Sequence, residues 1–120
     1  MTTWVVEYTD EFGQWWETLT PAQQAAIEAD VRLLERLGPL LSRPYADTVR
    51  GSRHSNMKEL STQCRGRPLR TFFAFDPRRS AILLIGGDKT GDDRFYERMI
   101  PLADRLYDEY SRELREEGLI

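Results

Sequence analysis

Three apolar segments joined by very short connections occupy the middle of the chain, and they restrict the fold more than any other feature. Residues 57–62, 69–76 and 81–86 are rich in aliphatic, aromatic and β-branched side chains. Both connections contain proline, and the first also contains glycine, so each is expected to turn the chain. Connections of this length cannot hold a crossover helix, so neighbouring strands must run antiparallel. The sequence therefore predicts a three-stranded antiparallel meander.

The strand expected at residues 69–76 separates its side chains into two faces, because successive residues of a strand point to opposite sides. The odd-numbered set suits packing against helices. The even-numbered set carries charge and is expected to line an open face, with Arg70 facing solvent. The two sets are Leu69, Thr71, Phe73 and Phe75, and Arg70, Phe72, Ala74 and Asp76.

The segments before the meander predict one strand followed by two helices. Residues 4–8 are aromatic and β-branched and predict a strand, after which Asp10 is expected to cap a short helix. The Thr-Pro-Ala-Gln sequence at residues 20–23 fits the capping box of a second helix. That helix is expected to end at the Gly-Pro pair at residues 38–39.

The rest of the chain is expected to loop over residues 39–55, form the meander and end in a helix. This helix is predicted from Asp92 to about Tyr110 or beyond, with a break or restart at Pro101 because proline lacks a backbone N–H. The predicted fold is α+β: a small antiparallel sheet in β-α-α-β-β-β-α order, with the helical pair packed on one face and a C-terminal helix. Residues 1–120 are expected to form a single domain.

Composition excludes several classes of protein. Cys64 is the single cysteine, so no intrachain disulfide can form, and a cytoplasmic location is expected. The first residues lack a signal-peptide pattern, and no apolar run approaches the roughly 18 residues of a membrane helix. His54 is the single histidine and cannot form a zinc site with one cysteine, so neither a metal nor another cofactor is expected.

Positive charge is concentrated in the segment that holds the meander. Residues 43–79 contain nine Lys and Arg against three acidic residues, a net charge of +6, whereas residues 1–42 carry −5 and residues 80–120 carry −4. A basic stripe on short strands between acidic helices favours a surface that binds a polyanion such as nucleic acid. The acidic flanks are expected to limit indiscriminate binding.

An ordered set of short motifs extends from about Trp4 to Tyr110. The motifs are Leu33-Leu34-Glu35-Arg36-Leu37-Gly38-Pro39-Leu40 with Arg43-Pro44, Gly51-Ser52, Asn56-Met57-Lys58-Glu59-Leu60, Leu69-Arg70-Thr71-Phe72-Phe73-Ala74-Phe75-Asp76-Pro77, Gly86-Gly87-Asp88-Lys89-Thr90-Gly91, Phe95-Tyr96 and Ile100-Pro101-Leu102-Ala103-Asp104. In this set the chain resembles the HigB-type toxins, the phage-derived-protein branch of the RelE/ParE superfamily. One position departs from the family pattern, which has arginine after Glu-Leu where this chain has Ser61.

The resemblance implies a RelE-like fold and the toxin of a type II toxin–antitoxin pair. Such toxins are metal-independent endoribonucleases, or mRNA interferases, that cleave mRNA on the ribosome. The implied partners are a cognate helix-turn-helix antitoxin, the ribosome and mRNA. Two alternatives stay open, because a shared fold does not fix function. One is a non-enzymatic gyrase inhibitor like the ParE-type relatives, and the other is a degenerate toxin that retains only antitoxin binding.

Three residues are candidates for catalysis of RNA cleavage. Arg70 could clamp a phosphate and stabilise developing negative charge, or it could be an ordinary surface arginine. Glu59 is expected on the same face and could act as general base if its pKa is raised, or serve as a salt-bridged structural carboxylate. The resemblance implies that Lys89 reaches the RNA phosphate or the base-catalysis position, although this lysine also fits an exposed turn. Its glycine-rich surroundings lack the Walker spacing.

Six further residues are expected to bind RNA, and charged turns offer a plainer explanation for several of them. Tyr96 could stack on a base or donate a proton, whereas its place beside an apolar helical stripe favours core packing. Lys58 neighbours Glu59 on one strand and must face the opposite side. His54 is expected to be a solvated loop residue. The six are Lys58, Arg50, Arg53, Arg65, Arg67 and Tyr96, with Arg78 and Arg79 as further contacts of RNA or antitoxin.

Overall fold

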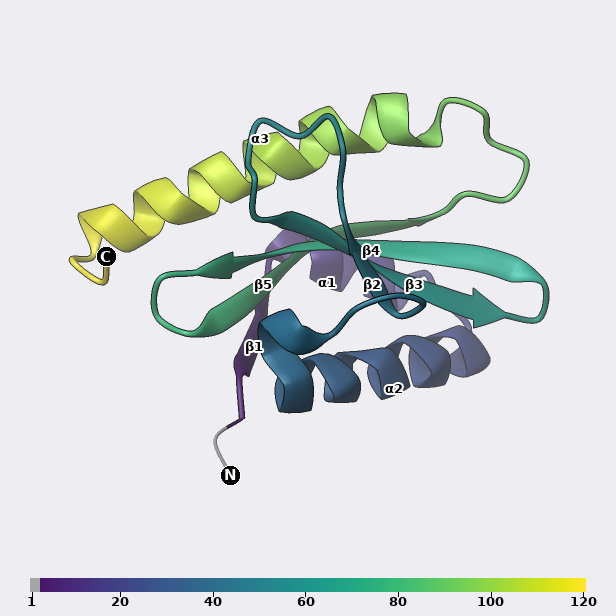
Figure 1. Ribbon diagram of the computed structural model, residues 1–120. Helices are drawn as coiled ribbons and strands as arrows, with labels where there is room; N and C mark the ends of the chain where they lie inside the picture. The colour runs from purple at the N-terminus through teal and green to yellow at the C-terminus, as the bar shows by residue number, and fades with distance from the viewer. Residues whose placement is uncertain (1–2) are drawn as a thin grey trace.

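The computed structural model describes residues 3–120, and the predicted α+β fold is confirmed (Figure 1). The elements follow the predicted order, with one short strand and one turn of 3-10 helix added before the meander. None of the helices in these residues has the length and apolar character that a membrane span requires. The elements are β1 Val5–Tyr8, α1 Asp10–Glu17, α2 Pro21–Leu37, η1 Gly38–Leu40, β2 Ala46–Thr48, β3 Met57–Cys64, β4 Arg67–Asp76, β5 Ser80–Asp88 and α3 Phe95–Glu116.

The strands of the described chain form one sheet in the order β1-β5-β4-β3-β2. The meander of β3, β4 and β5 is antiparallel as predicted, and β1 joins it in parallel with β5. Arg65 and Gly66 make a two-residue turn between β3 and β4, with φ angles of 52° and 81°. Positive φ at both positions is the geometry that suits a tight hairpin, so β3 extends to the residue just before the turn.

Helices α1 and α2 cover one face of the sheet, as the alternation in β4 predicts (Figure 1). Phe73 of β4 is buried in a cluster with Phe12 of α1 and Leu34 of α2. Gly86 of β5 permits this close packing, because a Cβ atom there would lie 2.1 Å from the ring of Trp15. The helical pair and the odd-numbered face of β4 therefore build the first half of the core.

Helix α3 covers the second face, so the expectation of an open face is wrong. Phe72 and Ala74 of β4 are fully buried in a cluster with Phe95 and Met99 of α3. Gly87 lets the helix approach, because a Cβ atom there would lie 2.8 Å from the Phe95 ring. The apolar residues of the even-numbered set outweigh its two polar ones, and burying them against an amphipathic helix is favourable.

The segment predicted as a loop contains β2, which pairs with the outer edge of β3. The Ala-Asp-Thr sequence of β2 has too few residues and too little β-branching to predict a strand, so pairing with β3 decides its conformation. The loop that follows β2 rises to α3 (Figure 1). There the buried Asp104 carboxylate accepts hydrogen bonds from the Ser52 hydroxyl and from the Arg53 backbone N–H.

Local signals predicted one helix start fully and two other features incorrectly. The capping box at residues 20–23 is present, with both reciprocal hydrogen bonds. Thr9 rather than Asp10 caps α1, because its hydroxyl accepts the Phe12 N–H at 3.0 Å. Helix α3 runs through Pro101 without a break. Proline removes one hydrogen bond there, and the buried apolar face of α3 offsets this loss.

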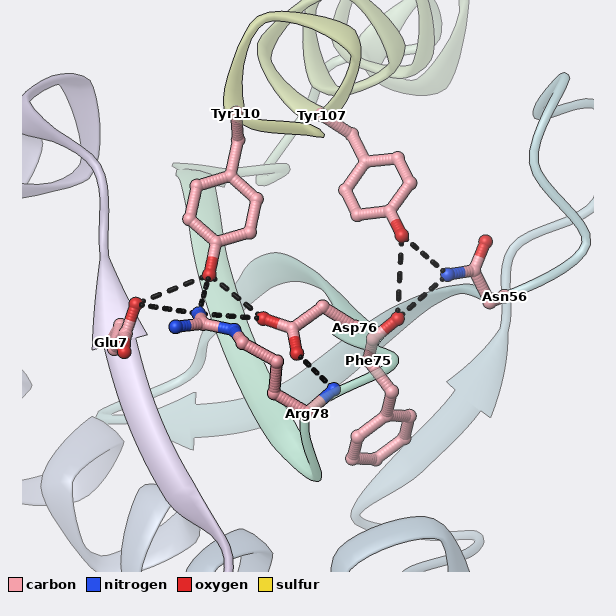
Figure 2. Close-up of polar contacts among 7 residues, drawn as sticks. All are labelled: Glu7, Asn56, Phe75, Asp76, Arg78, Tyr107 and Tyr110. Carbon is pink, nitrogen blue, oxygen red and sulfur yellow. Dashed lines mark hydrogen bonds and ion pairs between the residues drawn. The ribbon is translucent and has the colours of Figure 1, made fainter. Parts of the chain in front are cut away.

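A polar network at one end of the sheet fastens the C-terminal half of α3 (Figure 2). Tyr107 and Tyr110 point from α3 toward the sheet. The Tyr110 hydroxyl lies 2.8 Å from Asp76 Oδ2 and 2.7 Å from Arg78 Nη2, and Glu7 of β1 completes the group. Burial raises the pKa of Asp76, but hydrogen bonds from Arg78 and Tyr110 outweigh it and hold the pKa below its usual value. Arg78 therefore contributes to the docking of α3, and its expected contact with RNA or antitoxin stays a prediction.

Candidate active site

Four side chains from separate segments converge near the opposite end of β4. Glu59 comes from β3, Arg70 from β4, Lys89 from the residue after β5, and Tyr96 from the first turn of α3. Three of them are the catalytic candidates of the sequence, and Tyr96 is one of its expected RNA contacts. We call these four residues the candidate cluster.

Arg70 and Glu59 form a largely buried ion pair within the candidate cluster. Arg70 Nε lies 3.6 Å from Glu59 Oε1, and the two side chains are only 12% and 13% exposed. Arg70 Nη1 donates to the Leu69 carbonyl at 3.0 Å, whereas the buried Nε has no hydrogen-bond acceptor among residues 3–120. The expectation that Arg70 faces open solvent is therefore wrong. The unused donor is a feature that an added anion could satisfy.

Tyr96 serves both the core and the candidate cluster. Its ring packs edge-on against Phe72 with centroids 6.2 Å apart, while its hydroxyl donates to Glu59 Oε1 at 2.9 Å. Burial raises the pKa of Glu59, against the lowering effects of Tyr96, Arg70 and Lys89. Burial and the bond to Glu59 raise the pKa of Tyr96. Glu59 is thus a better proton acceptor than an exposed glutamate, and Tyr96 holds its proton near neutral pH.

The loop after β5 sets the position of Lys89. Asp88 accepts a hydrogen bond from the Thr90 N–H at 2.9 Å and pairs with Arg67 at 3.0 Å. Lys89 Nζ lies 5.2 Å from the centroid of the Tyr96 ring, within cation–π range. The Lys89 amino group is therefore held against Tyr96 within the candidate cluster, and the Arg67–Asp88 pair stabilises the loop that carries Lys89.

Two loop residues with sequence-based expectations contact α3. Arg53, an expected RNA contact, pairs with Asp108 at 2.5 Å and lies 3.8 Å from Asp104. His54 contacts Asp108 at 2.8 Å, and its ring packs against Tyr107 with centroids 4.8 Å apart. His54 is therefore an ordered partner of α3, contrary to the expectation of a solvated residue. Their shared partner Asp108 lies about three helical turns from Tyr96 along α3.

The other expected RNA contacts lie at different distances from the candidate cluster. Lys58 faces the opposite side of the sheet from Glu59, as alternation predicts, and its Nζ donates to Thr48 Oγ1 at 3.0 Å. Arg65 is exposed at the tip of the β3–β4 turn. Arg50 is exposed after β2 and lines an open depression that also contains Glu59. Arg50 therefore lies beside the cluster, whereas Lys58 lies on the other face.

Sequence reasoning missed the surroundings of Glu59, because they depend on β2. Asp47 lies directly opposite Glu59 in the strand register, and Arg43 pairs with it at 2.9 Å. Hydrogen bonds from Arg43 and the Thr48 N–H hold the pKa of Asp47 below its usual range. No pattern in a three-residue strand could have revealed this neighbour. The described residues contain no group of three His, Cys, Asp or Glu side chains arranged to hold a metal ion.

Comparisons with known proteins agree with the resemblance read from the sequence. The family described as "Phage derived protein Gp49-like" matches residues 14–108, which include the whole candidate cluster. A Mycobacterium tuberculosis protein named "Putative toxin HigB3" is 45% identical over 93 residues, covering 77% of this chain and 80% of that protein. A second, named "Putative toxin HigB2", is 41% identical over 103 residues, covering 84% of this chain but only 51% of that protein. The chain therefore belongs to the Gp49-like family of phage-derived proteins, within its HigB-type toxin branch.

Proposed function

We propose that this chain is the toxin of a type II toxin–antitoxin pair and that it cleaves mRNA on the ribosome without a metal. Family membership supports the toxin. The convergence of Glu59, Arg70, Lys89 and Tyr96 is the observation that supports RNA cleavage. These residues supply a proton acceptor, two cations and a proton donor, which are the groups that metal-independent cleavage of RNA needs.

In the first half of the proposed reaction, a ribose 2′-oxygen attacks the adjacent phosphorus. Glu59 takes the proton of that hydroxyl, for which its raised pKa is suited. Arg70 and Lys89 balance the negative charge that grows on the phosphate oxygens. Arg70 Nε, which has no acceptor within the described chain, is available for one of those oxygens.

In the second half, the bond from phosphorus to the 5′-oxygen breaks. The Tyr96 hydroxyl gives its proton to the leaving oxygen, and protonated Glu59, 2.9 Å away, returns a proton to Tyr96. The products are a 2′,3′-cyclic phosphate and a 5′-hydroxyl, and every protein group ends in its starting state. The Glu59–Tyr96 hydrogen bond is thus the route by which the two proton transfers are joined.

The proposed partners follow from this activity and from the family. The ribosome holds the mRNA in an extended form, and exposed arginines such as Arg50 and Arg65 are suited to phosphate contacts. A cognate helix-turn-helix antitoxin would silence the toxin in the cytoplasm. Arg50 and Arg65 belong to the basic segment at residues 43–79, which would thus contribute to binding of ribosomal or messenger RNA.

The Glu59→Gln substitution tests the catalytic role, because an amide cannot accept the proton. In a translating extract with a reporter mRNA, the wild-type chain should shorten the transcript, and Glu59→Gln should be slower by at least about 100-fold. Glu97→Gln is the matched control, since Glu97 is an exposed residue of the same helix as Tyr96. Primer extension locates the cuts, and Glu97→Gln should cut at the wild-type rate.

The pH dependence of cleavage is a second test of the catalytic role of Glu59. Because burial raises the pKa of Glu59, the cleavage rate should climb with pH beyond the range in which an ordinary glutamate is already ionised. This rise of the cleavage rate with pH should be absent in Glu59→Gln.

Growth arrest of cells with intact transcripts and altered DNA supercoiling would instead support the gyrase-inhibitor alternative.

A further inference from the structure

An open pocket lies beside the candidate cluster, between β2 and α3, with a volume of about 350 Å³. It shares two residues with the cluster, so a ligand in the pocket would touch the groups assigned to proton transfer. Its lining combines apolar side chains with charged groups. The residues used below are Asp47, Val49, Arg50, Glu59, Tyr96 and Ile100.

The apolar part of the pocket suits a flat aromatic ligand. Val49 and Ile100 offer aliphatic surface, and Tyr96 offers an aromatic ring that can contact a base. The volume is near the lower end of small-molecule sites, which is roughly 300 Å³, so the pocket is sized for a single nucleoside. One base of an extended RNA is therefore a suitable occupant.

The charged part of the pocket can read the edge of that base. Arg50 is exposed and carries paired guanidinium donors, which match two neighbouring acceptors. Asp47 carries paired acceptors, and its bonds to Arg43 and the Thr48 N–H fix its orientation. Guanine presents both partners at once: the acceptors O6 and N7 on one edge, and the donors N1–H and N2–H on the other. The remaining RNA bases lack this pair of bidentate edges.

We propose that this pocket holds the base immediately 5′ of the cleaved bond and selects guanine there, an inference that rests on the proposed RNA cleavage. The place of the bound base, 5′ of the cleaved bond, follows from Glu59. This residue lines the pocket and also accepts the proton of the attacking 2′-hydroxyl in the proposed reaction. A base seated in the pocket therefore belongs to the nucleotide whose ribose meets Glu59. Arg50 and Asp47 are the residues that determine specificity.

The first experiment maps cleavage in a translating extract over a transcript of varied sequence. The wild-type chain should show guanine enriched at the position 5′ of the cuts, and Arg50→Ala should lose most of this preference, by at least about fivefold. Arg112→Ala is the control, because Arg112 is an exposed arginine on α3 outside the pocket. Its preference should equal that of the wild type. Cuts without guanine enrichment, or an enrichment that survives in Arg50→Ala, would overturn the pocket assignment.

The second experiment measures binding, so it decides the inference even if the wild-type chain does not cleave. The probe is a fluorescent uridine hexamer with one internal 2′-deoxyguanosine, which lacks the attacking hydroxyl. Replacing its guanine by adenine should raise the Kd by at least about fivefold. A complete absence of cleavage would reject the proposed function alone, whereas equal affinity for the two probes rejects guanine selection.

Single-atom changes in the same probe separate the two reading residues. A 7-deazaguanine probe lacks N7 and should bind the wild type more weakly than the guanine probe does. Arg50→Ala should bind these two probes equally. An inosine probe lacks the N2 amino group and should bind the wild type more weakly than the guanine probe does, whereas Asp47→Ala, which has no side-chain acceptor, should bind the two probes equally. Equal sensitivity of the wild type and both variants to these changes would show that the base is read elsewhere.

Discussion

At the scale of single residues, Ser61 sets how much positive charge the candidate cluster holds. Ser61 is the direct partner of Arg70 across β3 and β4, so the two side chains share one face of the sheet. The HigB-type pattern has arginine at this position. Its replacement by serine therefore removes a guanidinium from beside Arg70, on the face where the proposed reaction places the phosphate.

Restoring that arginine should strengthen RNA binding. With Ser61→Arg, a further charged hydrogen bond to phosphate should tighten binding by about tenfold at low salt. Ser61→Gln is the control, because it extends the side chain without adding charge. Fluorescence anisotropy with a short RNA measures the effect. The same affinity for both variants would mean that position 61 does not face the bound phosphate.

At the scale of elements, α3 joins the two polar ends of β4. Its C-terminal half docks through Tyr110 on Asp76, and its first turn brings Tyr96 to Glu59. The apolar stripe between them packs on the sheet. Docking at one end therefore contributes to the position of the proposed proton donor at the other end.

The Asp76→Asn substitution should reveal how much the docking network stabilises the fold. The Asp76 side chain is 1% exposed and pairs with Arg78, and breaking a buried pair costs on the order of 3 kcal/mol in unfolding free energy. The folded-state pKa of Asp76 lies below its usual 3.8, so this stability is present above that pH and is lost as pH falls through the lower folded value.

Thermal unfolding at several pH values measures this effect. Wild type and Asp76→Asn should differ most near neutral pH and converge in the acid range. The matched control is Asp93→Asn, an exposed carboxylate at which the same change should have little effect at any pH. A constant difference between wild type and Asp76→Asn down to strongly acid pH would contradict the linkage.

At the scale of the whole molecule, folding neutralises much of the basic segment at residues 43–79. Five of its arginines form ion pairs with carboxylates, and some of these carboxylates belong to other parts of the chain. Arg50 and Arg65 are exposed and form no ion pair within the described residues. The five pairs are Arg43–Asp47, Arg53–Asp108, Arg67–Asp88, Arg70–Glu59 and Arg78–Asp76.

Ribosome binding should therefore depend on salt and on particular exposed arginines. Affinity should fall steeply between about 50 and 200 mM salt, as counterions return to the phosphates. Arg65→Glu should weaken binding and reduce the salt slope by about one or two, whereas Arg112→Glu on α3 should do so much less. Arg67 is a poorer choice, because its reversal also breaks the pair with Asp88. Co-sedimentation with ribosomes measures the affinity and the salt slope of both variants. Equal losses of affinity in Arg65→Glu and Arg112→Glu would show that ribosome binding does not depend on the basic segment.

Local patterns in the sequence determined the meander, the two faces of β4 and the start of α2. Alternation depends on adjacent residues, and the capping box joins residues only three apart, so neither needs distant contacts. Alternation within β3 puts Glu59 and Ser61 on one face, and the family pattern at position 61 favoured the face of Arg70 for both. The four cluster residues could thus be named from strand faces, turn chemistry and the family pattern.

Only the tertiary structure decided what covers these residues and which charges meet. Residues 46–48 form strand β2 because they pair with β3, and this pairing places Asp47 opposite Glu59. Helix α3 buries the face of β4 that the sequence predicts to be open. Its Asp104 and Asp108 pair with Arg53, and its Tyr96 hydroxyl donates a hydrogen bond to Glu59. These contacts join residues tens of positions apart in the chain, and their energies depend on burial, which a linear pattern of charges does not contain.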